Sequence, residues 1–205
     1  MLVDVERRRD AAATREAILQ AAEQLFAEHG YEGTTMERIA RRAGYARATP
    51  AYFFGSKEKL YRAVLDRVVS RAAEALAAAY RDGDAAPTPR EVIEPLVTAF
   101  VNFLARDSAY VRLIQREGLR DRPIVGHLVP IDATRRTLST LAAVHGTADA
   151  SRLLVELVAL CWFPFAQAHT LLGALDIDPH SAEFLESHKQ RVVALLTRDR
   201  TDGAR

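Results

Sequence analysis

The sequence has little cysteine, no long apolar run and almost no net charge, and each shortage excludes a class of protein. Cys161 is the one cysteine in 205 residues, so the chain can form neither an internal disulfide nor a four-cysteine zinc site. No apolar run reaches the roughly 18 residues of a membrane-spanning helix, and no export signal is recognisable. We therefore expect a cytoplasmic protein without a membrane partner.

Catalytic patterns are also missing. The six histidines show no metal-ligand spacing, and we find no nucleophile–base pair, clustered carboxylates or phosphate-binding loop. These absences argue against an enzyme and predict no metal site and no cofactor. With a net charge of +1, any affinity for nucleic acid has to come from charge placed locally.

The periodicity of apolar residues is helical throughout. Ile18, Ala22, Leu25 and Phe26 share one face of a first helix, which Gly30 is expected to end. No stretch alternates as a strand would, so the predicted class is all-α. Residues 82–89 predict a loop, and Pro130 and Pro164 are expected to kink or split their helices. The later helices are expected over 57–81, 90–106, 108–119, 122–145, 149–173 and 179–198.

Two short helices joined by a glycine turn follow the first helix. Thr34 and Glu37 match a capping box, and the apolar stripe behind them ends at Gly44. A second short segment runs from Ala46 to Phe54, and Ser56 is a good N-cap for the long helix that follows. This arrangement predicts a three-helix bundle with a helix-turn-helix. It divides the chain into a DNA-binding domain (1–56) and a larger helical domain (57–205).

The charge of this segment favours DNA as its partner. Residues 35 to 59 carry six basic side chains against two acidic ones, an excess of four in a chain whose total is +1. Side chains on the second short helix could reach base edges or phosphates, and the N-terminus of the next helix offers backbone donors. The residues expected to contact DNA are Thr35, Arg47, Thr49, Tyr52 and Lys57.

The segment AAEQLFAEHGYEGTTMERIARRAGYARATPAYFFGSKEKLYRAV resembles the DNA-binding domain of the TetR/AcrR family of regulators. The resemblance covers roughly residues 14–65. It implies a repressor that a small molecule releases from a palindromic operator, and a homodimer joined through the last two long helices. Residues 57–205 would accordingly be the helical ligand-binding and dimerisation domain. The landmarks are Leu25-Phe26, Gly30-Tyr31, Thr34-Thr35, Ile39-Ala40, Ala43-Gly44, Phe54 and Ser56-Lys57-Glu58.

The second short helix departs from the family pattern. Ala46 stands where serine is usual, and Pro50-Ala51 replaces a leucine–tyrosine pair, with Tyr52 one residue further on as the candidate substitute. Two registers fit Pro50. The helix could begin at Ala46, or Thr49 could be the N-cap with Pro50 as the first helical residue. The first register is favoured because proline is tolerated near a helix start.

The C-terminal part supports two expectations. The last two long helices carry apolar stripes, which alone indicate core helices, and the resemblance implies that they form the dimer interface. DNA binding also favours a dimer, since a lone reading helix binds DNA weakly, and a two-fold dimer places its reading helices about 34–36 Å apart. Aromatic residues on apolar faces are expected to line an effector pocket: Phe100, Phe103, Tyr110, Trp162 and Phe165. The alternatives are a transcriptional activator and an architectural DNA-binding protein without an effector pocket.

Overall fold

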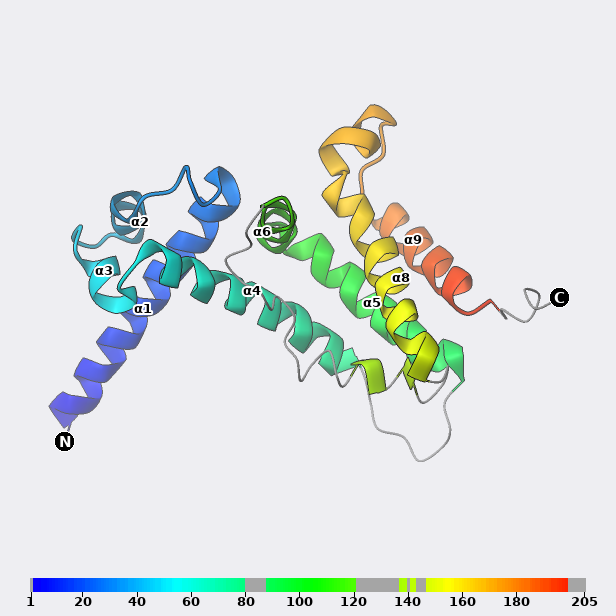
Figure 1. The fold of residues 1–205 in the computed structure, drawn as a ribbon, viewed down its shortest axis with the longest axis horizontal. Helices are drawn as coiled ribbons and strands as arrows, with labels where there is room; N and C mark the ends of the chain where they lie inside the picture. The colour runs from blue at the N-terminus through cyan, green and yellow to red at the C-terminus, as the bar shows by residue number, and fades with distance from the viewer. Residues whose placement is uncertain (1, 80–87, 121–136, 140, 143–146, 199–205) are drawn as a thin grey trace. The chain divides into compact units, whose positions relative to one another are not determined.

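The computed structural model describes residues 2–79, 88–120, 137–139, 141–142 and 147–198. Every regular element within these ranges is a helix and none is a β-strand, so the all-α prediction is confirmed (Figure 1). Most of the helix expected over 122–145, with Pro130, lies outside the described residues. None of the helices so described combines the length and apolarity needed to cross a membrane.

The chain divides into two compact units. The first is Met1–Val68 with Arg112–Leu128, and the second is Val69–Val111 with Val129–Arg205. The boundary between the units, at Val68 and Val69, lies inside helix α4 (Lys57–Ala79). The compact units therefore do not separate at residue 56. Whether DNA binding and ligand binding separate at that residue stays a prediction.

The first unit contains a bundle of three helices, as predicted. Helix α1 (Leu2–His29) packs against α2 (Met36–Ala43) and α3 (Thr49–Phe54) (Figure 1). Its core includes Phe26 from α1, Ile39 from α2 and Phe54 from α3. Helix α4 is joined to α1 by Arg67, whose guanidinium lies 2.6 Å from Glu16 and 3.4 Å from Glu23.

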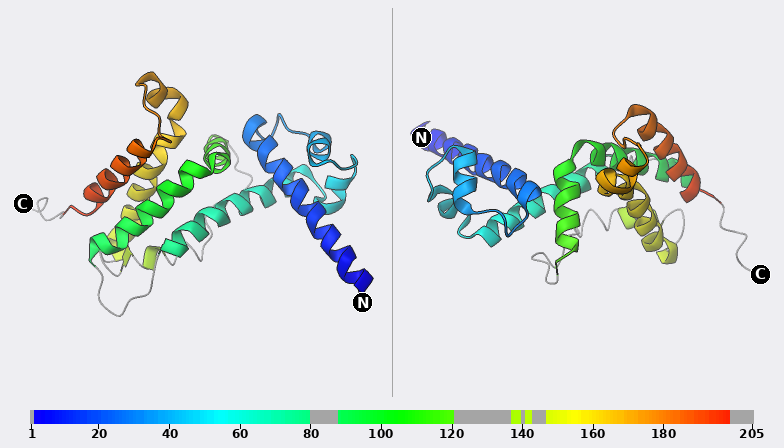
Figure 2. Two further views of the ribbon diagram at one scale, coloured as in Figure 1. Left: turned by 180° about the vertical axis from the view of Figure 1, so that it is seen from behind. Right: turned by 90° about the horizontal axis from the view of Figure 1, so that it is seen from above.

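The second unit is built on three helices that contact one another: α5 (Pro89–Arg106), α8 (Thr147–Ala166) and α9 (Ala182–Leu196) (Figure 2). Helix α8 runs through Pro164 and ends at Ala166, and the π-helical segment η1 (Ala168–Leu172) follows. The helix expected over 149–173 is therefore divided at Gln167, beyond the proline. One apolar core joins the three helices: Val92, Ile93, Leu96, Val97, Phe100, Val101, Leu104, Leu153, Leu157, Cys161, Phe165, Val192, Val193 and Leu196.

Candidate nucleic-acid interface

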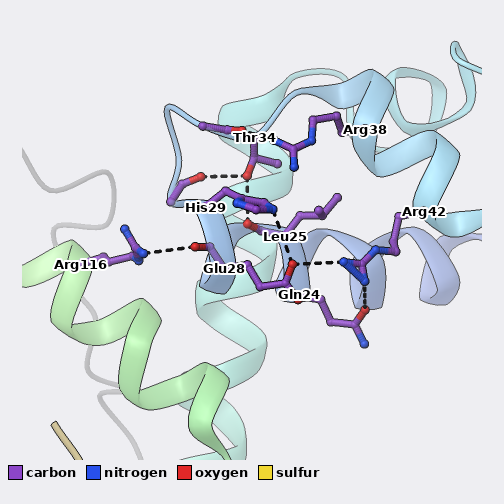
Figure 3. Close-up of polar contacts among 10 residues, drawn as sticks. Gln24, Leu25, Glu28, His29, Thr34, Arg38, Arg42 and Arg116 are labelled. Atoms are coloured by element: carbon purple, nitrogen blue, oxygen red, sulfur yellow. Dashed lines mark hydrogen bonds and ion pairs between the residues drawn. The ribbon is translucent and has the colours of Figure 1, made fainter. Parts of the chain in front are cut away.

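The N-terminus of α2 is capped by Thr35. Its hydroxyl accepts a hydrogen bond from the backbone N–H of Arg38 at 3.2 Å, and its backbone is extended. The capping box predicted from Thr34 and Glu37 is therefore wrong by one residue. The reason is that Thr34 is fully buried, with its hydroxyl 3.0 Å from the Leu25 carbonyl and 2.8 Å from the Gly30 carbonyl at the end of α1 (Figure 3).

Lys57 binds the loop between α1 and α2. Its ammonium donates to the carbonyls of Tyr31 and Thr34, at 2.9 and 3.1 Å, and lies 4.1 Å from the centre of the Tyr31 ring. The side chain is half-buried. An ammonium has three donors, so at most one remains for a phosphate. Lys57 thus fixes the entry to α2, and its contact with DNA stays a prediction.

The turn between α2 and α3 uses a left-handed glycine. Gly44 has φ +78°, and the backbone N–H of Tyr45 returns to the Ala40 carbonyl, which closes the end of α2. A single turn follows, in which the Thr49 N–H bonds to the Ala46 carbonyl at 2.9 Å. The chain therefore reverses within five residues.

Helix α3 begins at Thr49, three residues later than the favoured register predicted. Pro50 explains the difference, because a helix begun at Ala46 would need a hydrogen bond from the Pro50 nitrogen to the Ala46 carbonyl, and proline has no N–H to give. The structure instead places Pro50 near the helix start, with Ala48 as an N-cap that makes no side-chain bond. The observed helix is closer to the less favoured register, in which Thr49 was the N-cap, although the observed N-cap, Ala48, lies one residue earlier.

Three of the five predicted DNA contacts lie on α3 or in the turn before it. Tyr52 projects outward with 84% of its surface exposed, and Thr49 is half-buried. Arg47 lies in the turn before α3, exposed, with its guanidinium 3.6 Å from Glu37. Thr35 is exposed at the start of α2. Phe54, at the C-terminal end of α3, is buried. The Arg15 guanidinium lies over its ring, 4.8 Å from the ring centre.

Residue-level reasoning missed an arginine-lined hollow beside α2. The hollow measures about 290 Å³ and is lined by Leu25, His29, Arg38, Arg41 and Arg42. From the sequence, these arginines were counted among the basic residues of 35–59 but were not expected to form a site. Their spacing of three and four along α2 was the signal that could have identified a shared face.

The C-terminal half of α6 (Ser108–Gly118) belongs to the first unit and contributes a buried glutamate, Glu117, to it. Glu117 has no exposed surface and accepts a hydrogen bond from the Tyr61 hydroxyl of α4 at 2.9 Å. Burial raises the pKa of Tyr61, and the bond to Glu117 adds to the rise. Arg116 donates to the Glu28 carbonyl at the end of α1, at 3.3 Å (Figure 3). Helix α6 is thus joined to both α1 and α4.

Tyr61→Phe is expected to lower the free energy of unfolding by about 2 kcal/mol, because a hydrogen bond to the buried carboxyl group of Glu117 is lost while the ring packing is kept. Chemical denaturation followed by circular dichroism measures it. Tyr45→Phe is the matched control: Tyr45 is exposed, and removing its hydroxyl is expected to change stability by less than about 0.5 kcal/mol. Equal effects of the two variants would contradict a structural role for the Tyr61 hydroxyl.

Three of the predicted effector-pocket residues lie together in the second unit. The Phe103 ring stacks on Phe100, with centroids 6.4 Å apart, and meets Tyr110 edge-on at 5.0 Å. Burial raises the pKa of Tyr110 to about 12, with a smaller contribution from the charge of Asp107. Trp162 and Phe165 lie apart from these contacts, on α8. Phe100 and Phe165 are buried in the core, so they pack the helices together.

A groove of about 570 Å³ runs between α4 and α5, and Phe103 is the predicted residue that lines it. One wall carries an ion pair, in which the Arg71 guanidinium lies 2.7 Å from Asp107. A buried donor lies elsewhere in the unit: the indole nitrogen of Trp162 has no hydrogen-bond partner among the described residues. The groove is lined by Arg71, Glu74, Ala75, Ala99, Asn102, Phe103, Arg106 and Asp107.

Within the described ranges, no group of histidine, cysteine and acidic side chains is arranged to hold a metal ion. Cys161 is buried in the α5–α8–α9 core, and burial raises the pKa of its thiol to about 12. A thiol held protonated is a poor nucleophile and a poor metal ligand. Cys161 is therefore a packing residue in this fold.

The chain is similar in sequence and in fold to bacterial regulators. Residues 18–64 match the family described as bacterial regulatory proteins, tetR family. The transcriptional repressor AcnR of Corynebacterium efficiens is 43% identical over 61 residues, which are 30% of this chain and 32% of AcnR. That similarity thus spans about a third of the relative's length.

Two further similarities extend over most of the chain. The transcriptional repressor NicS of Pseudomonas putida is 26% identical over 185 residues, covering 84% of this chain and 85% of NicS. The solved structure of SCO4942 from Streptomyces coelicolor superposes with a TM-score of 0.68 at 22% identity, covering 89% of this chain and 96% of that one. At this identity the superposition establishes the fold alone.

Proposed function

The chain belongs to the TetR family of bacterial regulatory proteins, and from this premise we propose that it is a homodimeric repressor whose operator binding is released by a small molecule. The observation that carries the proposal is the surface around α3, where Tyr52 and Arg47 project from a helix-turn-helix whose scaffold is fully packed. A second helix of a helix-turn-helix reads base edges in the major groove. The similar proteins AcnR and NicS are repressors, which supports the same role here.

Exposed apolar side chains on α8 and α9 support the dimer. Val155, Val158 and Phe163 follow one face of α8, with exposed fractions of 67%, 38% and 50%. Leu195 of α9 is also half exposed, although Leu153, Leu157 and Val192 of the same helices are buried within the unit. Large exposed apolar surfaces mark interaction sites in soluble proteins. A second copy of the chain, related by a two-fold axis, is the proposed occupant.

The groove between α4 and α5 is the proposed effector site in the second unit. Its volume lies within the range of small-molecule pockets. Phe103 offers an aromatic surface, while Asn102 and Arg106 offer donors, so the proposed effector is a small amphipathic molecule with an acceptor or acidic group. Trp162, with its unpartnered indole N–H, stays a predicted contact.

The helix-turn-helix domains of the two subunits are here called the reading heads. Release from DNA requires that the effector bind one arrangement of these reading heads more tightly than another. Helices α4 and α6 both pass from the second unit into the first. Arg71 of α4 lines the groove, and Tyr61 of the same helix holds Glu117 of α6. We propose that an effector in the groove acts on the reading head through these two helices.

The test is to select the duplex that the purified protein prefers and then to measure binding by fluorescence anisotropy while small molecules are screened for release. Specific retention of one palindromic duplex and its release by a screened molecule support the proposal. Binding of all duplexes alike, with no release, is the outcome expected of an architectural protein and would contradict it.

Arg47→Ala is expected to reduce the ratio of operator affinity to non-specific affinity by at least about thirtyfold, because a dimer presents two copies and each arginine contributes roughly 1–3 kcal/mol of base discrimination. Anisotropy on the selected duplex and on a scrambled one measures the ratio. Glu37→Gln, which removes the neighbouring acid and leaves the guanidinium in place, is the control expected to keep the ratio. Equal losses on both duplexes for Arg47→Ala would make it a phosphate contact.

A further inference from the structure

Helix α2 presents three guanidinium groups beside the C-terminal end of α1. Arg38, Arg41 and Arg42, here called the arginine face, line the hollow of about 290 Å³ together with Leu25 and His29. Ile39 and Ala40 occupy the opposite side of the helix and are buried. The arginine face is therefore held in place by the packing of α2, and it lies on the helix that Thr35 begins.

The three arginines are engaged to different extents. The Arg42 guanidinium lies 3.1 Å from the Glu28 carboxylate and 3.4 Å from the Gln24 side-chain oxygen (Figure 3). Arg38 donates through one nitrogen to the Gly33 carbonyl at 2.7 Å, which leaves its other donors available. Arg41 is exposed, and no described residue accepts a hydrogen bond from its guanidinium or pairs with it.

The chemistry of this face fits phosphodiester groups. Guanidinium donors match two oxygens of one phosphate, and such charge-assisted bonds are among the strongest that a surface can offer. The hollow is too small and too charged for a folded partner, whereas the first helix of a helix-turn-helix crosses the DNA backbone. Along α2, Arg38 lies about one turn and Arg41 about two turns beyond the proposed DNA contact at Thr35.

We propose that Arg41, assisted by the free donors of Arg38, binds phosphates of the DNA backbone beside the bases that α3 reads. Arg42 is committed to Glu28 and forms the wall of the hollow. The inference rests on the proposed DNA-binding function and adds contacts that supply affinity without sequence information. Each head of a dimer carries one copy, so the operator complex gains two phosphate contacts from Arg41.

The test compares Arg41→Gln with Arg42→Gln, which changes the net charge equally at a neighbouring position. Binding is measured from low to high salt on the selected operator and on a scrambled duplex. For Arg41→Gln we expect the slope of log affinity against log salt to become shallower by about two for the dimer, since each phosphate contact contributes roughly 0.9. Affinity is expected to fall by the same factor on both duplexes, while Arg42→Gln keeps the slope within about half of one contact.

Three results would overturn the inference. An unchanged salt slope for Arg41→Gln, with wild-type operator binding intact, would refute it and leave the proposed function standing. Equal changes for the two variants would mean that only net charge matters. A loss confined to the operator would make Arg41 a base contact. Failure of the wild-type protein to bind either duplex would refute the proposed function itself. Thermal unfolding of both variants confirms that they are folded.

Discussion

Val155→Asp is expected to convert the protein into monomers and to lower operator affinity about a hundredfold or more. Val155 is the most exposed apolar residue of the α8 face, with 67% of its surface accessible, so the substitution leaves the packed core untouched. In a dimer the same position would bury two carboxylates against apolar surface, which is costly without partners. A monomer would bind DNA through a single helix-turn-helix. It would therefore lose the gain in affinity that two linked binding sites give, roughly a factor of 10² to 10⁴.

Sedimentation velocity reports the oligomeric state, and anisotropy with the selected duplex reports the affinity. Ala78→Asp places the same charge on an exposed position of α4 and is expected to leave both unchanged. A Val155→Asp protein that remains dimeric and binds the operator as the wild type does would contradict the α8–α9 dimer. Monomers that keep full affinity would contradict the need for two heads.

Tyr52→Ala is the second large effect. A dimer presents two copies of this side chain, and each contact to a base or phosphate is worth roughly 1–3 kcal/mol. We therefore expect operator affinity to fall by at least about thirtyfold, measured by anisotropy at fixed salt. Stability should be unaffected, because Tyr52 is 84% exposed and its one ring–ring contact within the described residues is with the neighbouring Phe53.

Tyr52→Phe separates the two parts of this contact. If the hydroxyl bonds to a phosphate, the phenylalanine variant is expected to lose most of the affinity that Tyr52→Ala loses; if the ring stacks on a base or sugar, it is expected to keep it. Unchanged affinity in Tyr52→Ala would remove Tyr52 from the interface. It would also show that the departure from the family pattern at Pro50-Ala51 is not compensated one residue later.

Features set by local chemistry were predictable from the sequence. Gly30 and Gly44 end their helices with positive φ because glycine alone adopts that conformation without steric cost. Ser56 caps α4 through the Lys59 N–H, at 3.2 Å, as a serine before a helix does. These residues act within one turn of their own position, so the sequence contains the whole interaction.

Features that depend on distant groups were not predictable. Thr34 and Thr35 are equivalent as local N-caps, and the choice between them depends on the Leu25 carbonyl, nine residues away, which lies beside the Thr34 hydroxyl. Tyr61 and Glu117 are 56 residues apart, and no periodicity relates them. The start of α3 differs from these cases because its cause is local. Pro50 has no N–H for the Ala46 carbonyl, which disfavours a helix that begins at Ala46, and α3 begins at Thr49.

The central claim is that a dimer of this chain reads one palindromic duplex with the surface around α3. The most direct measurement is the stoichiometry and affinity of the purified full-length protein on the duplex selected from a random pool, compared with a duplex whose half-sites are moved apart by five base pairs. We expect two chains per duplex and loss of specific binding when the spacing changes, because the two helix-turn-helix domains would then have to bind opposite sides of the DNA. Equal affinity for the two spacings, or one chain per duplex, would contradict it.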